Sequence, residues 1–425
     1  MKMRTQIVYI LSFFMMSQAI TYKTAAGQDL DWKTCVEQTL KTHPELIKSK
    51  QKIKQAEADK KIKSASLLPQ ITGSANAQTS SSTGTSSQEQ YSYGASGKQL
   101  IFDGLKTPNE IKQASKQIEA QNFGYQLTSS DIRLNLKTAF AKLIQAQELI
   151  GLTQDILNRR TQNSRLVKLR YQGGKEHKGS LLTAEADTAQ AQFEVGQAKR
   201  NLITSQRNLS IAMGINKFQN VSAQGDFLLG DIYSQKPFFE NIVENTPFLK
   251  QLIATKDSYL YAKKAAKGEF FPEISLSSSL QRTGQQIQGD TNSFSAGISL
   301  SVPIFNGGSN INRVKKTHAA FLQSQADVES GYNQIILTLE QNWKSLQDEK
   351  ELLKVRQKFL QAAQERAKIA QAQYKIGLIT FNEWSIIEDS LANSQKAYLS
   401  AQVNLIISEA NWIHTIGGTL DDSIS

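Results

Sequence analysis

The sequence predicts a mainly α-helical fold with some β structure, built from two copies of one half. The first observation is a repeat with a constant offset of 203 residues, in which Pro44 returns as Pro247 and Gly214 as Gly417. The second is a leucine-rich heptad ladder in each copy, and the third is a pair of short segments in each copy in which apolar and small polar residues alternate. A repeat this long indicates a duplicated structural half, because repeat units of solenoids are about 20 to 50 residues long.

Residues 1–26 have the features of a secretory signal peptide. Lys2 and Arg4 form a charged start, residues 7–20 are largely apolar, and Thr24-Ala25-Ala26 supplies small residues for cleavage. A retained membrane anchor is the alternative, but the apolar stretch is shorter than the about 20 residues that a spanning helix needs. We therefore expect an exported chain that begins near residue 27.

The first half-repeat is expected over residues 27–214. Thr42 and Glu45 fit a capping box at the start of a helix that Pro69 ends. The elements expected after it are strands at about 70–78 and 91–102, a long helix over about 108–171 and a return helix over about 180–213. At about 1.5 Å per residue the long helix would measure about 96 Å, and its heptad ladder consists of Leu136, Leu143, Ile150 and Leu157.

A linker over residues 215–242 joins this half to the second, which is expected over 243–417 and is followed by a tail over 418–425. The corresponding elements are strands at about 273–281 and 294–305, a long helix over about 311–374 and a return helix over about 382–416. The second heptad ladder consists of Leu339, Leu346, Leu353 and Leu360. Strict heptads are typical of helices that supercoil around partners.

The strands of the second half alternate apolar residues with Ser and Gly, and they carry few charges. An ordinary hairpin of a soluble domain is one interpretation. A membrane-spanning pair is the other, because a tilted spanning strand needs about 9 to 11 residues and an inner face that tolerates water. Four strands cannot close a barrel, so several copies would have to share one: two copies would give a filled barrel and three a water-filled one.

Several function classes are not supported by the residues. The formal charge of +11 falls to +8 without Lys2, Arg4 and Lys23, and the basic residues alternate with acids along helices, so we expect no nucleic-acid partner. The four histidines are far apart in the sequence, and residues 174–180 lack the lysine that directly precedes the hydroxyl residue of a phosphate-binding loop. We expect no enzyme, no catalytic residues, no cofactor and no metal site.

With these features the chain resembles the TolC-type outer membrane efflux proteins, also called outer membrane factors. The resemblance rests on the duplicated halves, the prolines at 69 and 272, Ile-Phe-Asp/Asn-Gly at 101–104 and 304–307, and Tyr-x-x-Gly at 171–174 and 374–377. It implies a homotrimer in the outer membrane, with a twelve-stranded transmembrane β-barrel in contact with outer membrane lipid. It also implies a large periplasmic α-barrel of long antiparallel coiled-coil helices, a periplasmic adaptor (membrane fusion) protein and an inner-membrane transporter.

The resemblance also implies where functional residues lie. The turns at Tyr171, Gly174, Tyr374 and Gly377 would form the periplasmic tip on which adaptors dock. Members of the family often have two acids shortly after the second glycine, and here the first is Glu383 whereas the second position holds Ile386.

Glu383 is therefore a candidate for a constriction ring, or a helix-terminal acid favoured by the dipole. Phe381 and Trp384 would either close the tip or pack between helices. The function implied is the exit duct of a tripartite efflux pump or a type I secretion system. The alternatives are a stand-alone porin-like channel and a periplasmic coiled-coil adaptor or scaffold.

Overall fold

The computed structural model describes residues 28–81, 84, 87–218, 220–225 and 235–423. The predicted signal peptide therefore lies outside the described residues. The elements in chain order are β1 (Gln28–Leu30), α1 (Trp32–Thr42), α2 (Pro44–Ala65), β2 (Gln70–Ser80), β3 (Gln88–Asp103), α3 (Lys106–Gln172), α4 (Lys178–Ala212), β4 (Val221–Ala223), α5 (Phe239–Val243), α6 (Pro247–Gly268), β5 (Glu273–Gly284), β6 (Thr291–Ser301), α7 (Ser309–Ile376), α8 (Phe381–Thr415) and the 3-10 helix η1 (Asp421–Ser423).

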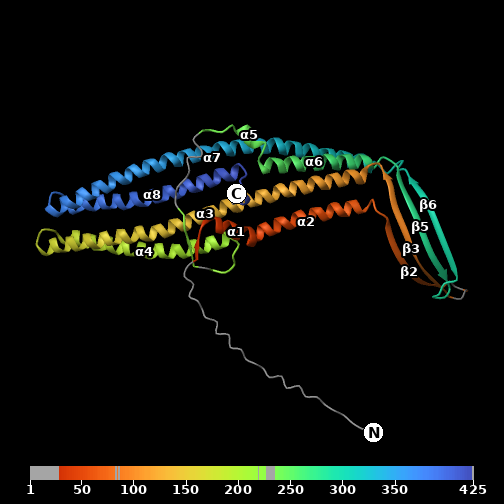
Figure 1. Cartoon of the computed structure of the whole chain (residues 1–425), viewed down its shortest axis with the longest axis horizontal. Coiled ribbons are helices and arrows are strands. Elements are labelled where there is room, and N and C mark those ends of the chain that lie inside the picture. Colours follow the sequence, from red (N-terminus) through yellow and green to blue (C-terminus); the bar gives the residue numbers. More distant parts are fainter. Residues whose placement is uncertain (1–27, 82–83, 85–86, 219, 226–234, 424–425) are drawn as a thin grey trace, which may run out of the picture.

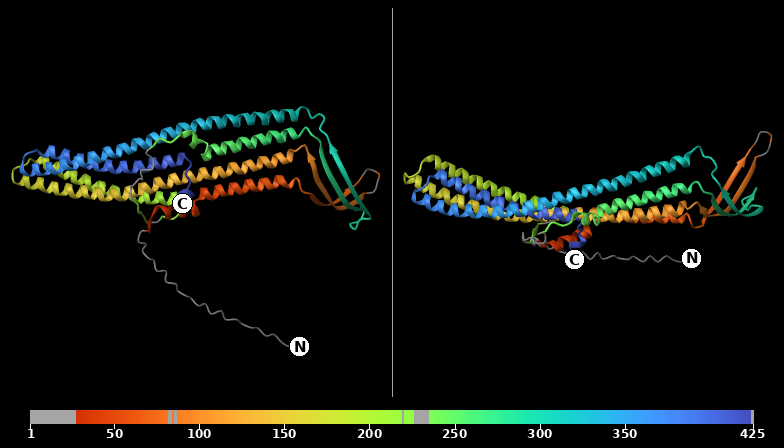
Figure 2. Two further views of the ribbon diagram at one scale, coloured as in Figure 1. Left: turned by 45° about the horizontal axis from the view of Figure 1, so that its top comes forward. Right: turned by 90° about the horizontal axis from the view of Figure 1, so that it is seen from above.

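The elements form one long curved layer with the sheet at one end (Figures 1 and 2). The antiparallel sheet has the order β2-β3-β5-β6. Helices α2, α3, α6 and α7 continue from it, and α2 contacts α3, α3 contacts α6 and α6 contacts α7, so they keep the order of the strands. At the far end, α4 packs on α3 and α8 on α7, with α8 also against α3. Among the described residues no helix is both long and apolar enough to cross a membrane.

The two faces of the sheet differ in chemistry, as the alternation predicts. The register places Leu276 opposite Ile298 and Leu280 opposite Phe294 on one face. The other face carries Ser279 opposite Ser295, and their hydroxyl oxygens are 2.8 Å apart. The apolar side chains of β6 are more exposed than a water-soluble sheet would leave them, with Phe294 at 72%. One face is therefore suited to lipid and the opposite face to water.

Each half builds its own helical core around the predicted heptad positions. In the first cluster Leu136 and Leu143 are completely buried beside Leu46 and Leu209. The repeat-related cluster holds four residues at the same offset of 203: Leu249, Leu339, Leu346 and Trp412. The leucine ladders of the two long helices thus pack within the chain. The ladder of α3 packs against α2 and α4, and the ladder of α7 packs against α6 and α8.

Glycines in the left-handed region end the four long and return helices. Gly174, Gly214, Gly377 and Gly417 have φ between 68° and 88°. At each of them the next residue donates its backbone N–H to a carbonyl five residues earlier, as in a Schellman motif. Because a side chain at such a φ is strained, the requirement explains why these glycines recur in both halves.

Three expectations need correction. The capping box at Thr42 and Glu45 is wrong, because His43 is the N-cap of α2 and its Nδ1 accepts from the Glu45 N–H. The strand expected to reach residue 305 ends at Ser301, ahead of Pro303, which lacks the N–H that a ladder needs. The expected linker also contains structure: β4 pairs in parallel with β1, and α5 covers the second core.

Exchange of Gly417 for Ala should destabilise the protein. A Cβ at Gly417 would lie 2.3 Å from Cδ of Pro247, in addition to the strain of its φ of +88°. We expect a loss of about 2 kcal/mol or more, measured by denaturant unfolding followed by circular dichroism. The control is Gly151→Ala at an exposed position of α3, where a Cβ would meet nothing within 4 Å. Stability should rise there by about 0.5 to 1 kcal/mol. Equal effects of the two changes on stability would contradict the role given to the left-handed φ of Gly417 and its close approach to Pro247.

Candidate functional site

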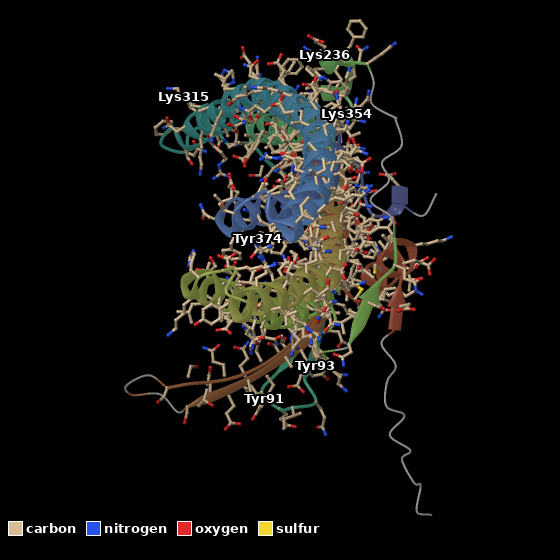
Figure 3. The ribbon with its side chains drawn as sticks, turned by 90° about the vertical axis from the view of Figure 1, so that its left-hand side faces the viewer. Tyr91, Tyr93, Lys236, Lys315, Lys354 and Tyr374 are labelled. Atoms are coloured by element: carbon tan, nitrogen blue, oxygen red, sulfur yellow. The ribbon has the colours of Figure 1, made fainter. Side chains whose placement is uncertain are left out.

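The candidate site is the end of the molecule farthest from the sheet, where the α3–α4 turn and the α7–α8 turn lie side by side (Figure 1). Figure 3 looks at the molecule from this end and shows Tyr374 between the α7–α8 pair and the α3–α4 pair. The two repeat-related Tyr-x-x-Gly segments form these turns, at Tyr171–Gly174 and Tyr374–Gly377. The structure thus brings together two segments that are 203 residues apart.

Aromatic side chains form the core of this tip. The rings of Tyr374 and Trp384 are stacked, with centroids 4.4 Å apart and an interplanar angle of 20°. Phe381 meets the Tyr374 ring edge-on at 6.3 Å. Tyr374, Trp384 and Phe381 are 0%, 1% and 9% exposed, and Val167 and Ala184 of the first half complete the cluster. In the single chain, Phe381 and Trp384 therefore have the packing role.

Two polar residues of the first half hold Tyr374. The Arg170 guanidinium lies over its ring at 4.7 Å, and Arg170 Nη1 donates to the Tyr374 carbonyl at 2.7 Å. The Tyr374 hydroxyl donates to Glu176 Oε2 at 2.9 Å. Burial raises the pKa of Tyr374, and the Glu176 carboxylate raises it further. The hydroxyl therefore stays protonated and acts as a donor.

Glu176 titrates below its ordinary range. Burial by itself would raise its pKa, but hydrogen bonds from Tyr374, from Ser180 and from the backbone of His177 outweigh burial, so the pKa is lowered. The carboxylate is charged at neutral pH and pairs with the buried tyrosine. This contact joins the α3–α4 turn to α7, and with the Arg170 hydrogen bond it links the two halves at the tip.

Glu383 has a different environment. It is exposed, and its Oε2 accepts from the Thr380 N–H at 2.8 Å while Thr380 Oγ1 accepts from the Glu383 N–H at 3.2 Å. This capping box starts α8. The hydrogen bonds from Thr380 lower the pKa of Glu383. Glu383 is thus not part of the aromatic cluster. In the single chain it acts as the helix-terminal acid that caps α8.

Further along α8, two acids that follow the expected pair are held by α3. Asp389 pairs with Arg160, and Glu388 lies 3.8 Å from Nε of Arg159. Arg160 also reaches Asp187 of α4 at 3.8 Å. Glu388 is 5% exposed, and burial raises its pKa although both arginines oppose the effect. These ion pairs form a second polar connection between the halves.

The sequence analysis singled out Tyr171, Gly174, Tyr374 and Gly377, which the structure places at the two turns, but it did not single out Arg170 and Glu176. Tyr171 is 39% exposed, and among the described residues its hydroxyl has no hydrogen-bond partner, unlike that of Tyr374. A signal did exist, because the repeat replaces Arg170 by Gln373 and Glu176 by Ile379. Among the described residues no three His, Cys, Asp or Glu side chains gather as metal ligands.

The chain matches the sequence profile described as outer membrane efflux protein over residues 35–215 and 239–418, which are the two halves of the repeat. It belongs to the outer membrane efflux protein family. Members of this family are transport channels of the outer membrane with large periplasmic parts, and they are not enzymes.

Individual members are distant in sequence but similar in fold. The outer membrane efflux protein BepC of Brucella suis biovar 1 (strain 1330) is 21% identical over 369 residues, covering 85% of this chain and 80% of BepC. The structure of CusC superimposes with a TM-score of 0.84 at 16% identity, covering 94% of this chain and 96% of CusC. The open state of the MtrE outer membrane channel of Neisseria gonorrhoeae superimposes with a TM-score of 0.83 at 16% identity, covering 92% of this chain and 90% of MtrE.

Exchange of Tyr374 for Phe should weaken the tip. It removes the hydroxyl that donates to Glu176 but keeps the stacked ring, so we expect a loss of about 1.5 to 3 kcal/mol in denaturant unfolding. Tyr171→Phe at the repeat-related position is the matched control and should change stability by less than about 0.5 kcal/mol. Similar values for the two variants would show that the hydroxyl contact is not stabilising.

The same contact predicts a dependence on pH. The pKa of Glu176 is below its ordinary value of 4.5 in the folded protein, so its contribution to stability is present above that value and is lost as pH falls through the lowered pKa. Tyr374→Phe should therefore lose less stability than the wild type when the pH is lowered through this range. Parallel acid titrations of unfolding midpoints would measure the difference, and coincident curves would contradict the prediction.

Proposed function

We propose that the chain is the exit duct of a tripartite efflux pump or a type I secretion system, working as a homotrimer. The observation that carries the proposal is the continuous layer of four strands and four helices whose strands are apolar on one face and serine-rich on the other. A stand-alone porin-like channel would not need helices of about 100 Å, and a periplasmic scaffold would not need the exposed apolar sheet face.

The free edges of the layer support the trimer. Among the described residues β2 and β6 each pair on one side only, over 11 residues. Unpaired backbone groups are not tolerated in hydrocarbon, so β6 of one chain would pair with β2 of the next. Three chains would close a barrel of about twelve strands around a water-filled passage. The helices, in the same order, would continue this wall as a periplasmic tunnel.

The tip is the place where the partners would act. We propose that a periplasmic adaptor docks on the grooves beside residues 171–181 and 374–384, and that an inner-membrane transporter supplies the energy. Opening would require the inner helices α7 and α8 to move relative to α3 and α4. The contacts of Tyr374 with Arg170 and Glu176 bridge these two helix pairs and would have to rearrange in that movement.

Two experiments test the function. In membranes fractionated with detergent, the protein should remain with the outer membrane, and its release in a soluble periplasmic extract would contradict the duct. A photo-crosslinking residue in place of exposed Lys375, beside Gly377, should capture an adaptor in cells. The matched control is the same residue in place of Gln288, in the β5–β6 turn at the sheet end, which should capture none.

Glu383 tests the constriction. In a trimer three copies of this exposed carboxylate would lie near the threefold axis and attract cations. Glu383→Gln retains a residue type suited to the capping box, so the fold should persist while the preference for cations over anions falls about two- to fivefold in planar bilayers. Glu365→Gln, an exposed site on α7, should leave selectivity unchanged. Equal selectivity in the wild type and Glu383→Gln would refute this role.

A further inference from the structure

Large apolar side chains stand exposed where the strands join the helices. Each of four positions in the first half has an apolar counterpart 203 residues later, and all eight side chains are at least 38% exposed. This junction belt consists of Leu67, Leu68, Ile101, Phe102, Phe270, Phe271, Ile304 and Phe305. An apolar surface of this kind marks a contact with protein or membrane.

The four helices that continue from the sheet, α2, α3, α6 and α7, each carry a lysine within the two helical turns nearest the sheet. These are Lys61 on α2, Lys112 on α3, Lys264 on α6 and Lys315 on α7, and the first and third, like the second and fourth, are 203 residues apart. Lys315 lies at one edge of the helical layer (Figure 3). The repeat thus preserves a row of positive charge, the lysine row, as well as an apolar belt.

The lysine row is on the side of the helices away from the serine-rich face. Lys63 and Glu110 line a cavity with Lys98, which stands on that face in register with Ser277. Lys61 comes two residues before Lys63, and Lys112 comes two residues after Glu110. Because two residues turn an α-helix by about 200°, these lysines point to the opposite side, which is the side of the apolar sheet face.

Three carboxylates on or beside these helices are paired with other cations. These pairs are Glu110 with Lys63 at 3.2 Å, Glu269 with Lys106 at 3.3 Å and with Arg313 at 2.9 Å, and Asp257 with Lys116 at 3.6 Å. In the part of the chain that the structure describes, no carboxylate lies within 4.0 Å of an ammonium nitrogen of the lysine row. The row therefore retains its charge for an outside partner.

Tyr261 ties two members of the row together. The ammonium nitrogens of Lys112 and Lys264 lie over its ring, 5.9 Å and 4.9 Å from the centroid. They come from neighbouring helices α3 and α6, which confirms that the two lysines share a face and a level. Tyrosine and lysine beside an apolar belt are typical of the interface between acyl chains and headgroups.

We propose that the junction belt and the lysine row form a collar that binds anionic phospholipids of the leaflet nearest the helices. This inference rests on the proposed place of the sheet in the membrane. A headgroup region is about 5 to 8 Å deep. If the junction belt lies at the boundary of the acyl chains, the lysine row lies one to two helical turns beyond it, away from the sheet. Their flexible side chains can then reach the lipid phosphates. One lysine near an anionic surface corresponds to about a fivefold change in a binding constant.

The experiment compares lipid preference in proteoliposomes of the intact protein, with spin-labelled phosphatidylglycerol and phosphatidylcholine as probes. The wild type should prefer phosphatidylglycerol several-fold, and the preference should decline with salt because exposed charges are screened. The quadruple variant K61Q/K112Q/K264Q/K315Q should bind both probes equally. A control variant, K354Q/K358Q, removes two exposed lysines of α7 far from the sheet and should keep the preference.

Three results would overturn the collar: no preference in the wild type, an unchanged preference in the quadruple variant, or an equal loss in the control. A double variant, K112Q/K264Q, provides a milder change around Tyr261 and should lose part of the preference while keeping the wild-type melting temperature. Flotation of the wild type with liposomes separates the two levels of inference. A protein that does not float contradicts the membrane function itself, whereas one that floats without lipid preference contradicts only the collar.

Discussion

The short junction between each strand and its helix is the constraint on which the structure depends. Only four residues separate α2 from β2, and two separate β3 from α3, so a helix cannot leave the strand it continues. The strand order β2-β3-β5-β6 therefore becomes the helix order α2-α3-α6-α7. Both edges of the layer, at β2 and at β6, are therefore left without a neighbouring strand in the described chain. In the proposed trimer, the next copy would pair with the strands and pack against the helices at the same edge.

Tight backbone contacts hold the junctions in place. A Cβ at Gly104 would lie 2.3 Å from the Gly268 carbonyl, so the start of α3 approaches the end of α6 as only glycines allow. At the other ends of α4 and α8, Gly214 approaches His43 and Gly417 approaches Pro247 in the same manner. The repeat thus preserves the close backbone approach at the ends of the return helices, at Gly214 and Gly417.

The two halves differ in the residues that meet at the tip. Arg170 and Glu176 hold the buried Tyr374, whereas Tyr171 at the equivalent position stands in solvent. An exact repeat would place the same groups in both halves. Because the halves differ here, the α3–α4 pair supplies Arg170 and Glu176 and the α7–α8 pair supplies the tyrosine that they hold.

The sequence by itself determined the duplication, the two long strands in each half, the heptad ladders and the glycines that end the long and return helices, because periodicity, proline and glycine act through local geometry. It did not predict the short β1 in the first half. It placed Tyr374, Phe381 and Trp384 at the tip through the resemblance. It failed where the outcome depends on a distant neighbour: His43 replaced Thr42 as the cap, and Thr42 instead donates to the carbonyl of Met213. The pairing of Tyr374 with Glu176 also needed tertiary structure, since hydrogen bonds between halves depend on how distant helices pack and have no period along the chain. The capping box of Thr380 and Glu383 is different, because it joins residues three apart and the local Thr-x-x-Glu pattern carries it.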